Sequence, residues 1–326
     1  MRMTVDAWAP EYGAGVDIGE PDELSVEKVD TGCEGREWAP IPAGERSALA
    51  GQKLAFIDGT RRIDARVFLS ANGEYPVPGV AGSVGVGAVV CEVPDAERAP
   101  GTPATPARIT DTRITRHLAV GDGRAERLTG GPGLEYTSLP VPGQDLDVCV
   151  DAVHNEMRNR EAVLAQELEA EGHLVFVDGP LAKLAPGPRR IVGYIKSHNR
   201  RYLGAEEEGI LAELGCGERT PLFSFGEKRQ RYSWYLRLCP PEEGMHGWHG
   251  VARCEVPWAL SVDEVAALAD ASTAALPLFA SRPYWDKRAP QNLVPVAGLE
   301  KRLRHLLGER ELVYRMIRSA AMKVPV

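Results

Sequence analysis

The sequence predicts an α/β fold in which a mixed five-stranded sheet is flanked by helices. Two segments, residues 54–58 and 174–178, predict strands most clearly, because each is a short apolar run that ends in Asp-Gly. Uninterrupted apolar runs of this length are typical of strands buried on both faces. Residues 146–171, which precede the second run, change to a helical period with an apolar stripe. Strand and helix patterns therefore alternate along one chain, as in α/β proteins.

The other elements follow from local patterns. Residues 61–69 largely alternate between apolar and polar, which predicts a second strand, antiparallel to the first across a tight turn at Asp58-Gly59-Thr60. Ser261, with Glu264 three residues later, predicts a capping box at the start of a helix. The remaining predictions are strands at 83–93, 109–120, 190–195, 232–238 and 250–256, helices at 205–214, 261–275, 292–307 and 309–320, a Pro-rich loop at 94–108 and an irregular segment at 121–143.

The chain shows no clean domain boundary. Residues 1–50 are rich in Gly, Pro and Glu and are predicted to form an N-terminal arm whose aromatic residues, Trp8, Tyr12 and Trp38, pack on the body or on a neighbouring subunit. Residues 51–326 are predicted to form a single domain, with a β-hairpin insertion around residues 71–145.

Bulk composition is that of a globular protein, with 326 residues, 44% hydrophobic and 26% charged. No apolar run approaches the roughly 20 residues that cross a bilayer, and the N-terminus lacks a signal-peptide pattern. The six cysteines form no C-x-x-C pair, so a zinc ribbon is not indicated and we expect a cytoplasmic protein. The net charge of −8 disfavours nucleic acid, but basic segments such as residues 196–201 leave a local basic groove open.

Three carboxylates are the candidate chemical groups. Asp58 and Asp178 end the two apolar strands, where a charge is costly unless a cation or hydrogen bonds compensate for it. Glu161 fills the gap in the apolar helical stripe between Met157 and Leu164, and such mismatches concentrate at functional sites. The alternatives are two ordinary Asp-Gly turns, and a helix whose Arg160 covers the inward face while Glu161 points outward.

The predicted order of strands is that of an RNase H-like core, in which the first three strands are antiparallel. In that arrangement Asp58, Glu161 and Asp178 converge at one edge of the sheet. Oxygen ligands of this kind suit Mg²⁺ or Mn²⁺ rather than zinc. Two such ions about 3.5–4 Å apart would clamp the attacking and leaving oxygens of a phosphodiester.

Several segments also carry a resemblance to a known family, and they run through most of the chain in order: residues 8–12, 56–61, 157–161, 177–181, 191–196, 253–257 and 288–293. Together they resemble the NurA family of DNA nucleases, in a bacterial-type member; archaeal members of the family work with the hexameric translocase HerA. The resemblance implies a Mn²⁺-dependent (or Mg²⁺-dependent) nuclease with 5′-to-3′ exonuclease and single-strand endonuclease activity. It further implies a homodimer docked on a HerA-type ATPase, in DNA-end processing, repair or defence.

The resemblance also assigns roles to residues. Asp58, Glu161 and Asp178 would be metal ligands, and Lys196 would face the scissile phosphate. Where the family has a histidine near the start of its last core helix, this chain has Gln291-Asn292, so Asn292 or Asp286 is the candidate fourth ligand. The expected substrate-binding residues are Thr60, Arg61, Arg62 and Arg200.

Two further motifs and two further functions stay open at this point. His246 and His249 form H-x-x-H in a Gly-rich turn, which is read as a surface loop in preference to a metal site. The basic run 228–231, followed by Tyr232, Trp234 and Tyr235, would bind a DNA strand or form a solvated hairpin. The alternative functions are a catalytically weak or inactive assembly subunit of a HerA-type complex and an RNA nuclease. No G-x-S-x-G, H-E-x-x-H or Walker A pattern is present.

Overall fold

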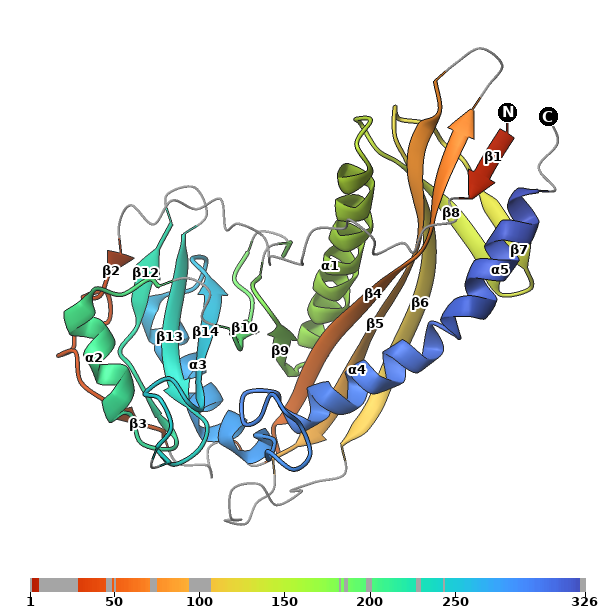
Figure 1. Cartoon of the computed structure of the whole chain (residues 1–326). Coiled ribbons are helices and arrows are strands. Elements are labelled where there is room, and N and C mark those ends of the chain that lie inside the picture. The colour runs from red at the N-terminus through yellow and green to blue at the C-terminus, as the bar shows by residue number, and fades with distance from the viewer. Residues whose placement is uncertain are drawn as a thin grey trace.

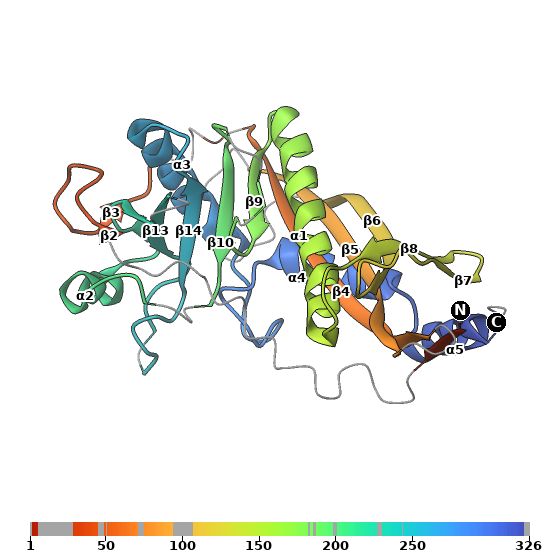
Figure 2. The same cartoon turned by 90° about the horizontal axis from the view of Figure 1, so that it is seen from above.

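The computed structural model (Figure 1) describes residues 2–5, 29–44, 49, 51–70, 75–93, 107–181, 183–184, 187–197, 201–226, 230–242 and 244–322. In this part of the chain one mixed sheet runs through the whole molecule, and helices lie on both of its faces (Figure 2). No helix among these residues is long and apolar enough to cross a membrane.

The strands are β1 (Arg2–Val5), β2 (Val29–Asp30), β3 (Ile41–Pro42), β4 (Lys53–Ser70), β5 (Val77–Glu92), β6 (Arg108–Val120), β7 (Leu128–Gly131), β8 (Leu134–Pro140), β9 (Leu174–Asp178), β10 (Ile191–Ile195), β11 (Glu218–Arg219), β12 (Phe223–Phe225), β13 (Arg231–Arg237) and β14 (Val251–Pro257). The helices are α1 (Leu146–Ala170), α2 (Ala205–Glu213), α3 (Val262–Ala275), the 3₁₀ helix η2 (Leu276–Phe279), α4 (Val294–Leu306) and α5 (Arg310–Ala321). Every predicted helix is confirmed, and α3 begins with the predicted capping box of Ser261 and Glu264.

The centre of the sheet has three antiparallel strands, a helix and then a parallel strand, as predicted, but the strands are not the predicted ones, because β4 combines the predicted strands 54–58 and 61–69. β4, β5 and β6 are successive antiparallel neighbours, α1 follows, and β9 then pairs in parallel with β4 on the side away from β5. β10 extends the sheet in parallel beyond β9. The predicted width of five strands is wrong, because the sheet has 14 strands within the described residues and continues through β14, β13 and β12 on one side.

The predicted hairpin turn at Asp58-Gly59-Thr60 is also wrong. β4 is one continuous strand of 18 residues, and Asp58, Gly59 and Thr60 pair with Gly87, Val86 and Gly85 of β5. Gly59 is required by packing instead, because a side chain there would overlap the Glu161 carboxylate and lie 2.8 Å from Met157 Cγ. The second Asp-Gly is a turn as predicted, and Gly179 has a φ of 106° there.

Two other predictions need correction. The segment 121–143, predicted as irregular, contains β7 and β8, and β8 pairs in parallel with β6. The arm supplies strands at distant places in the sheet, since β1 pairs with the end of β4 while β2 pairs with β12. Trp38 packs on the body, where its indole N–H donates to the Glu207 carbonyl oxygen at 2.9 Å. Trp8 and Tyr12 lie outside the described residues, and the division into an arm and one domain stays a prediction.

Side chains on β4 alternate between two hydrophobic cores. Phe56 belongs to the core that includes α3 and α4, whereas Ile57 belongs to the core under α1. The same alternation places Phe176 of β9 with α3 and α4, and Val177 with α1. Asp58 and Asp178, each one residue further on, therefore continue the face of the sheet that α4 covers.

Gly59→Ala tests the packing role of this glycine. We expect the variant to lose about 1–3 kcal/mol of unfolding free energy, because the added methyl group overpacks the contact between β4 and α1. Urea denaturation measures the loss.

Gly298→Ala is the matched control, because Gly298 is exposed on α4 and an added Cβ would meet nothing within 4 Å. This control is expected to gain about 0.5–1 kcal/mol from the helix preference of alanine. Equal stability of Gly59→Ala and the wild type would contradict the packing role.

Candidate active site

The candidate site lies where the sheet opens between β4 and β9. The two strands pair up to Ile57 and Val177, and β9 ends at the next residue, Asp178. β4 continues, and among the described residues the next strand along this edge is β1, which pairs from Val67 onward. We call this opening, beside Asp58 and at the end of β9, the notch.

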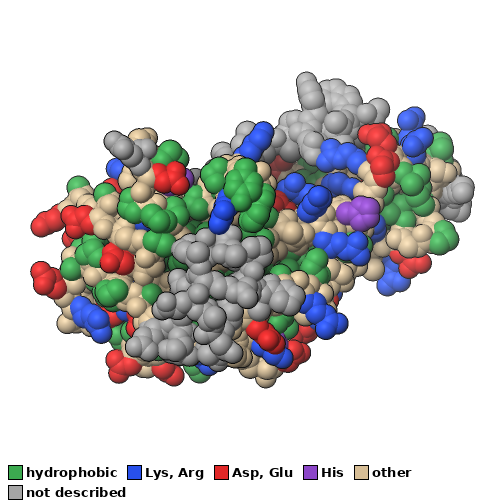
Figure 3. Space-filling view, turned by 90° about the horizontal axis from the view of Figure 1, so that it is seen from below, with side chains coloured by type: hydrophobic (Ala, Val, Ile, Leu, Met, Phe, Trp, Pro, Cys, Tyr) green, Lys and Arg blue, Asp and Glu red, His purple; other side chains and the backbone are tan. Residues whose placement is uncertain are grey.

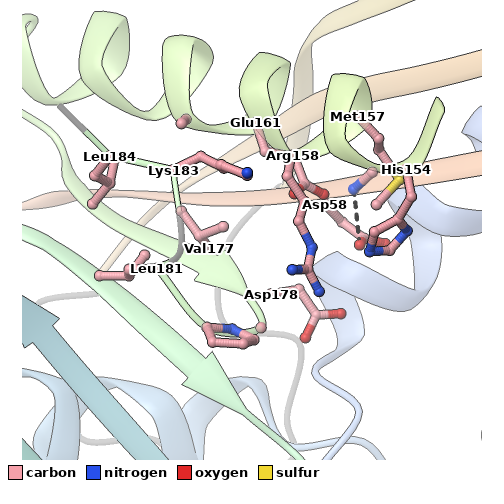
Figure 4. A pocket seen from close by; sticks show the side chains of 14 residues that line it. Asp58, His154, Met157, Arg158, Glu161, Val177, Asp178, Leu181, Lys183 and Leu184 are labelled. Carbon is pink, nitrogen blue, oxygen red and sulfur yellow. Dashed lines mark hydrogen bonds between the residues drawn. The ribbon is translucent and has the colours of Figure 1, made fainter. Parts of the chain in front are cut away.

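Carboxylates reach the notch from both faces of the sheet. Asp58 and Asp178 come from neighbouring strands on the α4 side. Glu161 comes from α1 on the other side and sits over Gly59, whose missing side chain leaves room for the carboxylate. Figure 4 shows Asp58, Glu161 and Asp178 around a cavity of about 200 Å³, which Arg158 also lines. The sequence-based prediction that Glu161 faces the sheet is confirmed, since only 7% of this residue is exposed.

Hydrogen bonds hold the strand carboxylates in place. Asp58 Oδ1 accepts from the Gly59 backbone N–H at 2.9 Å. Asp178 Oδ2 accepts from Lys196 Nζ at 2.6 Å, and the same Nζ donates to Asn292 Oδ1 at 3.0 Å. Lys196 directly follows β10, so the ends of two parallel strands bring this ion pair together.

Burial raises the pKa values of all three carboxyl groups, and repulsion by neighbouring carboxylates adds to it. Burial, with the Asp178 charge second, raises the pKa of Asp58 to about 8. Burial and then the charges of Asp58 and Asp178 raise the pKa of Glu161 well above its usual range. Burial also raises the pKa of Asp178, although Lys196 opposes this. The site is therefore short of positive charge, and a bound cation would stabilise the ionised carboxylates.

The loop after β9, which lines the cavity, is fixed by buried charges. Glu255 of β14 accepts a hydrogen bond from the Leu181 backbone N–H at 3.0 Å. The same carboxylate pairs with Arg253 at 2.8 Å and with Arg231. These residues explain the Arg-x-Glu segment at 253–255, because a fully buried carboxylate needs such partners.

Comparison with known protein families gives a match over part of the chain. Residues 144–296 match the family model of the NurA domain. This chain carries a NurA domain. The resemblance seen in the sequence is thereby confirmed, and the matched NurA domain contains Glu161, Asp178 and Lys196, while Asp58 precedes it.

A solved structure supports the fold over nearly the whole chain. The NurA nuclease from Sulfolobus solfataricus is similar with a TM-score of 0.50 and 12% sequence identity, and the match covers 90% of each chain. At this identity the likeness shows a shared fold. No curated protein matches the chain in sequence.

Asn292 and Asp286, the candidate fourth ligands, form a hydrogen-bond network that reaches Asp178 through Lys196. Asn292 is fully buried, and besides accepting from Lys196 it donates to Asp286 through Nδ2. Burial alone would raise the pKa of Asp286, but the Arg288 backbone N–H and the Asn292 amide outweigh it and lower the pKa. For Asn292 to bind a metal ion, its oxygen would have to be shared with or released by Lys196.

Sequence reasoning missed Glu300 on α4. Its charge contributes to raising the pKa values of Asp58 and Asp178, after burial and the nearer charges. Glu300 is held by Arg288 at 2.6 Å and by Arg304 at 2.5 Å. No gap in an apolar stripe marked Glu300, because Val296, Leu299 and Leu303 complete the buried face of α4 without it.

The predicted substrate-binding residues separate in the structure. Arg61 Nε donates to His154 Nδ1 of α1 at 2.7 Å, at the rim of the cavity. Arg62 instead binds Asp64 at 2.7 Å and the carbonyl oxygens of residues 307 and 308 at the end of α4, and its predicted contact with substrate stays a prediction. Thr60 is half-buried on β4, and Arg200 lies outside the described residues.

Two weaker motifs have structural explanations. Tyr232, Trp234 and Tyr235 are buried, so the prediction of a stacking surface there is wrong. The cause is that β13 is an interior strand with neighbours on both sides, β12 and β14, rather than a solvated hairpin. Among the described residues no three His, Cys, Asp or Glu side chains are grouped closely enough to hold a metal ion as they lie. This applies to Asp58, Glu161 and Asp178 at the notch as well as to the His246–His249 pair.

Asp58→Asn tests the electrostatics of the site through stability in EDTA. Because the folded protein raises the pKa of Asp58 from 3.8 to about 8, it holds this proton more tightly than the unfolded chain does. The stabilisation is complete below the ordinary pKa and is lost as pH rises to about 8. Relative to the wild type, the variant is expected to gain stability between pH 5 and pH 8.

Urea denaturation at several pH values measures the difference between the two proteins. Asp263→Asn, at an exposed position on α3, is the control and should follow the wild type throughout. Parallel pH profiles for Asp58→Asn and the wild type would show that Asp58 is not the repelled, buried carboxyl described above.

Proposed function

We propose that this chain is a metal-dependent nuclease that hydrolyses the phosphodiester bonds of DNA. The observation that carries the proposal is the convergence of Asp58, Glu161 and Asp178 at one notch, with Lys196 against Asp178. The NurA domain supports it, as does the shared fold with a protein described as a nuclease. The order of β4, β5, β6, β9 and β10 further supports an RNase H-like core.

The side chains of the notch have the chemistry that Mn²⁺ or Mg²⁺ needs, because both ions prefer oxygen ligands. All three side chains offer carboxylate oxygens, and burial, followed by the charges of neighbouring carboxylates, raises their pKa values. Asp58, Glu161 and Asp178 would hold the metal, as one or two ions, with their side chains moved closer together than they lie here. When bound, such ions supply Lewis-acid stabilisation of the phosphoryl group and lower the pKa of water.

Lys196 would contact the scissile phosphate. A lysine ammonium has three N–H donors, and two of them are engaged by Asp178 and Asn292. The third can donate to a phosphate oxygen while the first two keep the ammonium in place. Its positive charge would offset the charge that develops on the phosphoryl oxygens in the transition state.

The surface near the site offers a route for a polyanion in spite of the net charge of −8. Lys301, Arg302 and Arg304 are exposed on α4. Figure 3 shows Lys and Arg side chains gathered on the right of the face seen from below, the half that holds α4 and α5. Cations arranged in this way attract the phosphate backbone.

The wider biology of the proposal rests on the family resemblance. It comprises 5′-to-3′ exonuclease and single-strand endonuclease activity, a homodimer, and a HerA-type hexameric ATPase as partner in DNA-end processing, repair or defence. The site itself supports hydrolysis of the phosphodiester bond. The finer features are tested separately, by assays with different DNA substrates and with or without a HerA-type partner.

The direct test is cleavage of linear DNA by the purified protein with Mn²⁺. We expect Asp178→Asn to lower the rate by more than about 100-fold, because it removes a metal ligand and the partner of Lys196. Glu213→Gln, at an exposed position on α2, is the matched control and should keep the wild-type rate.

Other outcomes separate the competing functions. No cleavage by the wild-type protein, with or without a HerA-type partner, would favour the non-catalytic assembly subunit. Faster cleavage of RNA than of DNA of the same sequence would favour an RNA nuclease. Wild-type activity in Asp178→Asn would contradict the proposed site.

A further inference from the structure

The loop between η2 and α4 presents two large aromatic side chains to solvent. Tyr284 is 69% exposed and Trp285 is 53% exposed. Their rings contact each other in an edge-to-face arrangement, with centroids 5.0 Å apart. Single exposed aromatics are ordinary, but a contiguous exposed aromatic pair indicates a binding surface.

The loop holds this pair in a defined position. The Trp285 backbone N–H donates to the Arg282 carbonyl oxygen at 2.8 Å, and the Ala289 N–H donates to that of Asp286 at 3.1 Å. Asp286, next to Trp285, also accepts from the Arg288 backbone N–H at 2.8 Å. A ligand would therefore meet rings that are already placed, so less ordering entropy opposes binding.

A chain of hydrogen bonds joins the aromatic pair to the candidate active site. Asp286 accepts from the Asn292 amide, Asn292 accepts from Lys196 at 3.0 Å, and Lys196 donates to Asp178 at 2.6 Å. Trp285 is therefore one residue away from a network that ends on a candidate metal ligand. The network therefore ties the loop that carries the rings to Lys196 and Asp178.

Cationic side chains accompany the rings. The Arg282 guanidinium carbon lies 6.0 Å from the Trp285 ring centroid, and Arg282 Nη1 donates to the Tyr284 hydroxyl at 3.3 Å. Lys287 is exposed two residues further along. Aromatic faces for bases, with cations for phosphates, are the features that single-stranded nucleic acid binding needs.

We propose that Tyr284 and Trp285 form a stacking platform for unpaired bases of the nucleic acid strand that enters the notch. The proposal rests on the proposed nuclease function and extends it by naming the part of the substrate that is recognised. Bases stacked on the platform would position the adjoining phosphate near Lys196 and Asp178. A duplex end would have to fray to reach it, so the platform selects single-stranded segments.

The test is binding of a labelled single-stranded oligonucleotide in EDTA, measured by fluorescence anisotropy. We expect the variant Tyr284→Ala/Trp285→Ala to bind about 10- to 100-fold more weakly than the wild type, because stacking of one or two bases is lost. Trp285→Phe should keep most of the affinity, since it keeps an aromatic face. Binding of a blunt duplex should change far less.

Trp258→Ala is the matched control. Trp258 is 41% exposed and stacks on Tyr232 with centroids 4.3 Å apart. Trp258 follows β14 at its end away from the notch. β14 runs antiparallel to β10, and Arg253 pairs with Ile195, next to Lys196, so Pro257 at the end of β14 lies away from Lys196. This control should bind the oligonucleotide like the wild type, and thermal unfolding should show all the variants folded.

Binding in EDTA separates the platform from the nuclease function. If the wild type cleaves DNA, and the double variant binds single strands as tightly as the wild type does, the platform is refuted and the nuclease function stands. If the double variant loses binding and the wild type cleaves nothing, the platform stands without the nuclease function. Equal losses in Trp258→Ala, or a changed oligomeric state with unchanged binding, would also overturn the proposal.

Discussion

The candidate site depends on one packing constraint, the close approach of α1 to β4 at Gly59. β9 ends at Asp178 while β4 continues, so the sheet has an opening at this point. A side chain at residue 59 would overlap the Glu161 carboxylate. With glycine there, a carboxylate from one face of the sheet can meet two carboxylates from the other. The cost is electrostatic, and it appears in the raised pKa values of all three groups.

The surroundings of the notch are organised by alternating charges. Asp178, Lys196, Asn292, Asp286, Arg288 and Glu300 form a continuous series of hydrogen bonds and ion pairs. This series connects the end of β9 to α4 through the loop that carries Tyr284 and Trp285. On the other side, Glu255 and its two arginines fix the loop after β9. The strand ends are thus held by polar partners that are distant along the chain. Such support keeps the side chains of a site in one geometry.

Much of this arrangement was predictable from the sequence, and the failures have physical causes. Glu161 broke a helical apolar stripe, and the order of strands placed Asp58 beside Asp178. Gly59 was misread as a turn, because a glycine serves equally for a turn and for close packing, and only the tertiary contact with α1 distinguishes them. Arg62 looked available for a phosphate until the end of α4 supplied its partners. The aromatics of β13 are buried because a neighbouring strand lies on either side, which local patterns do not reveal.

The most direct test of the central claim is the anomalous density of a crystal soaked with Mn²⁺. We expect one or two peaks at the notch, each about 2.0–2.3 Å from oxygens of Asp58, Glu161 or Asp178. Glu161 should contribute a ligand although it comes from the opposite face of the sheet. Density at another place, such as the His246–His249 pair, with none at the notch, would contradict a metal site at the notch.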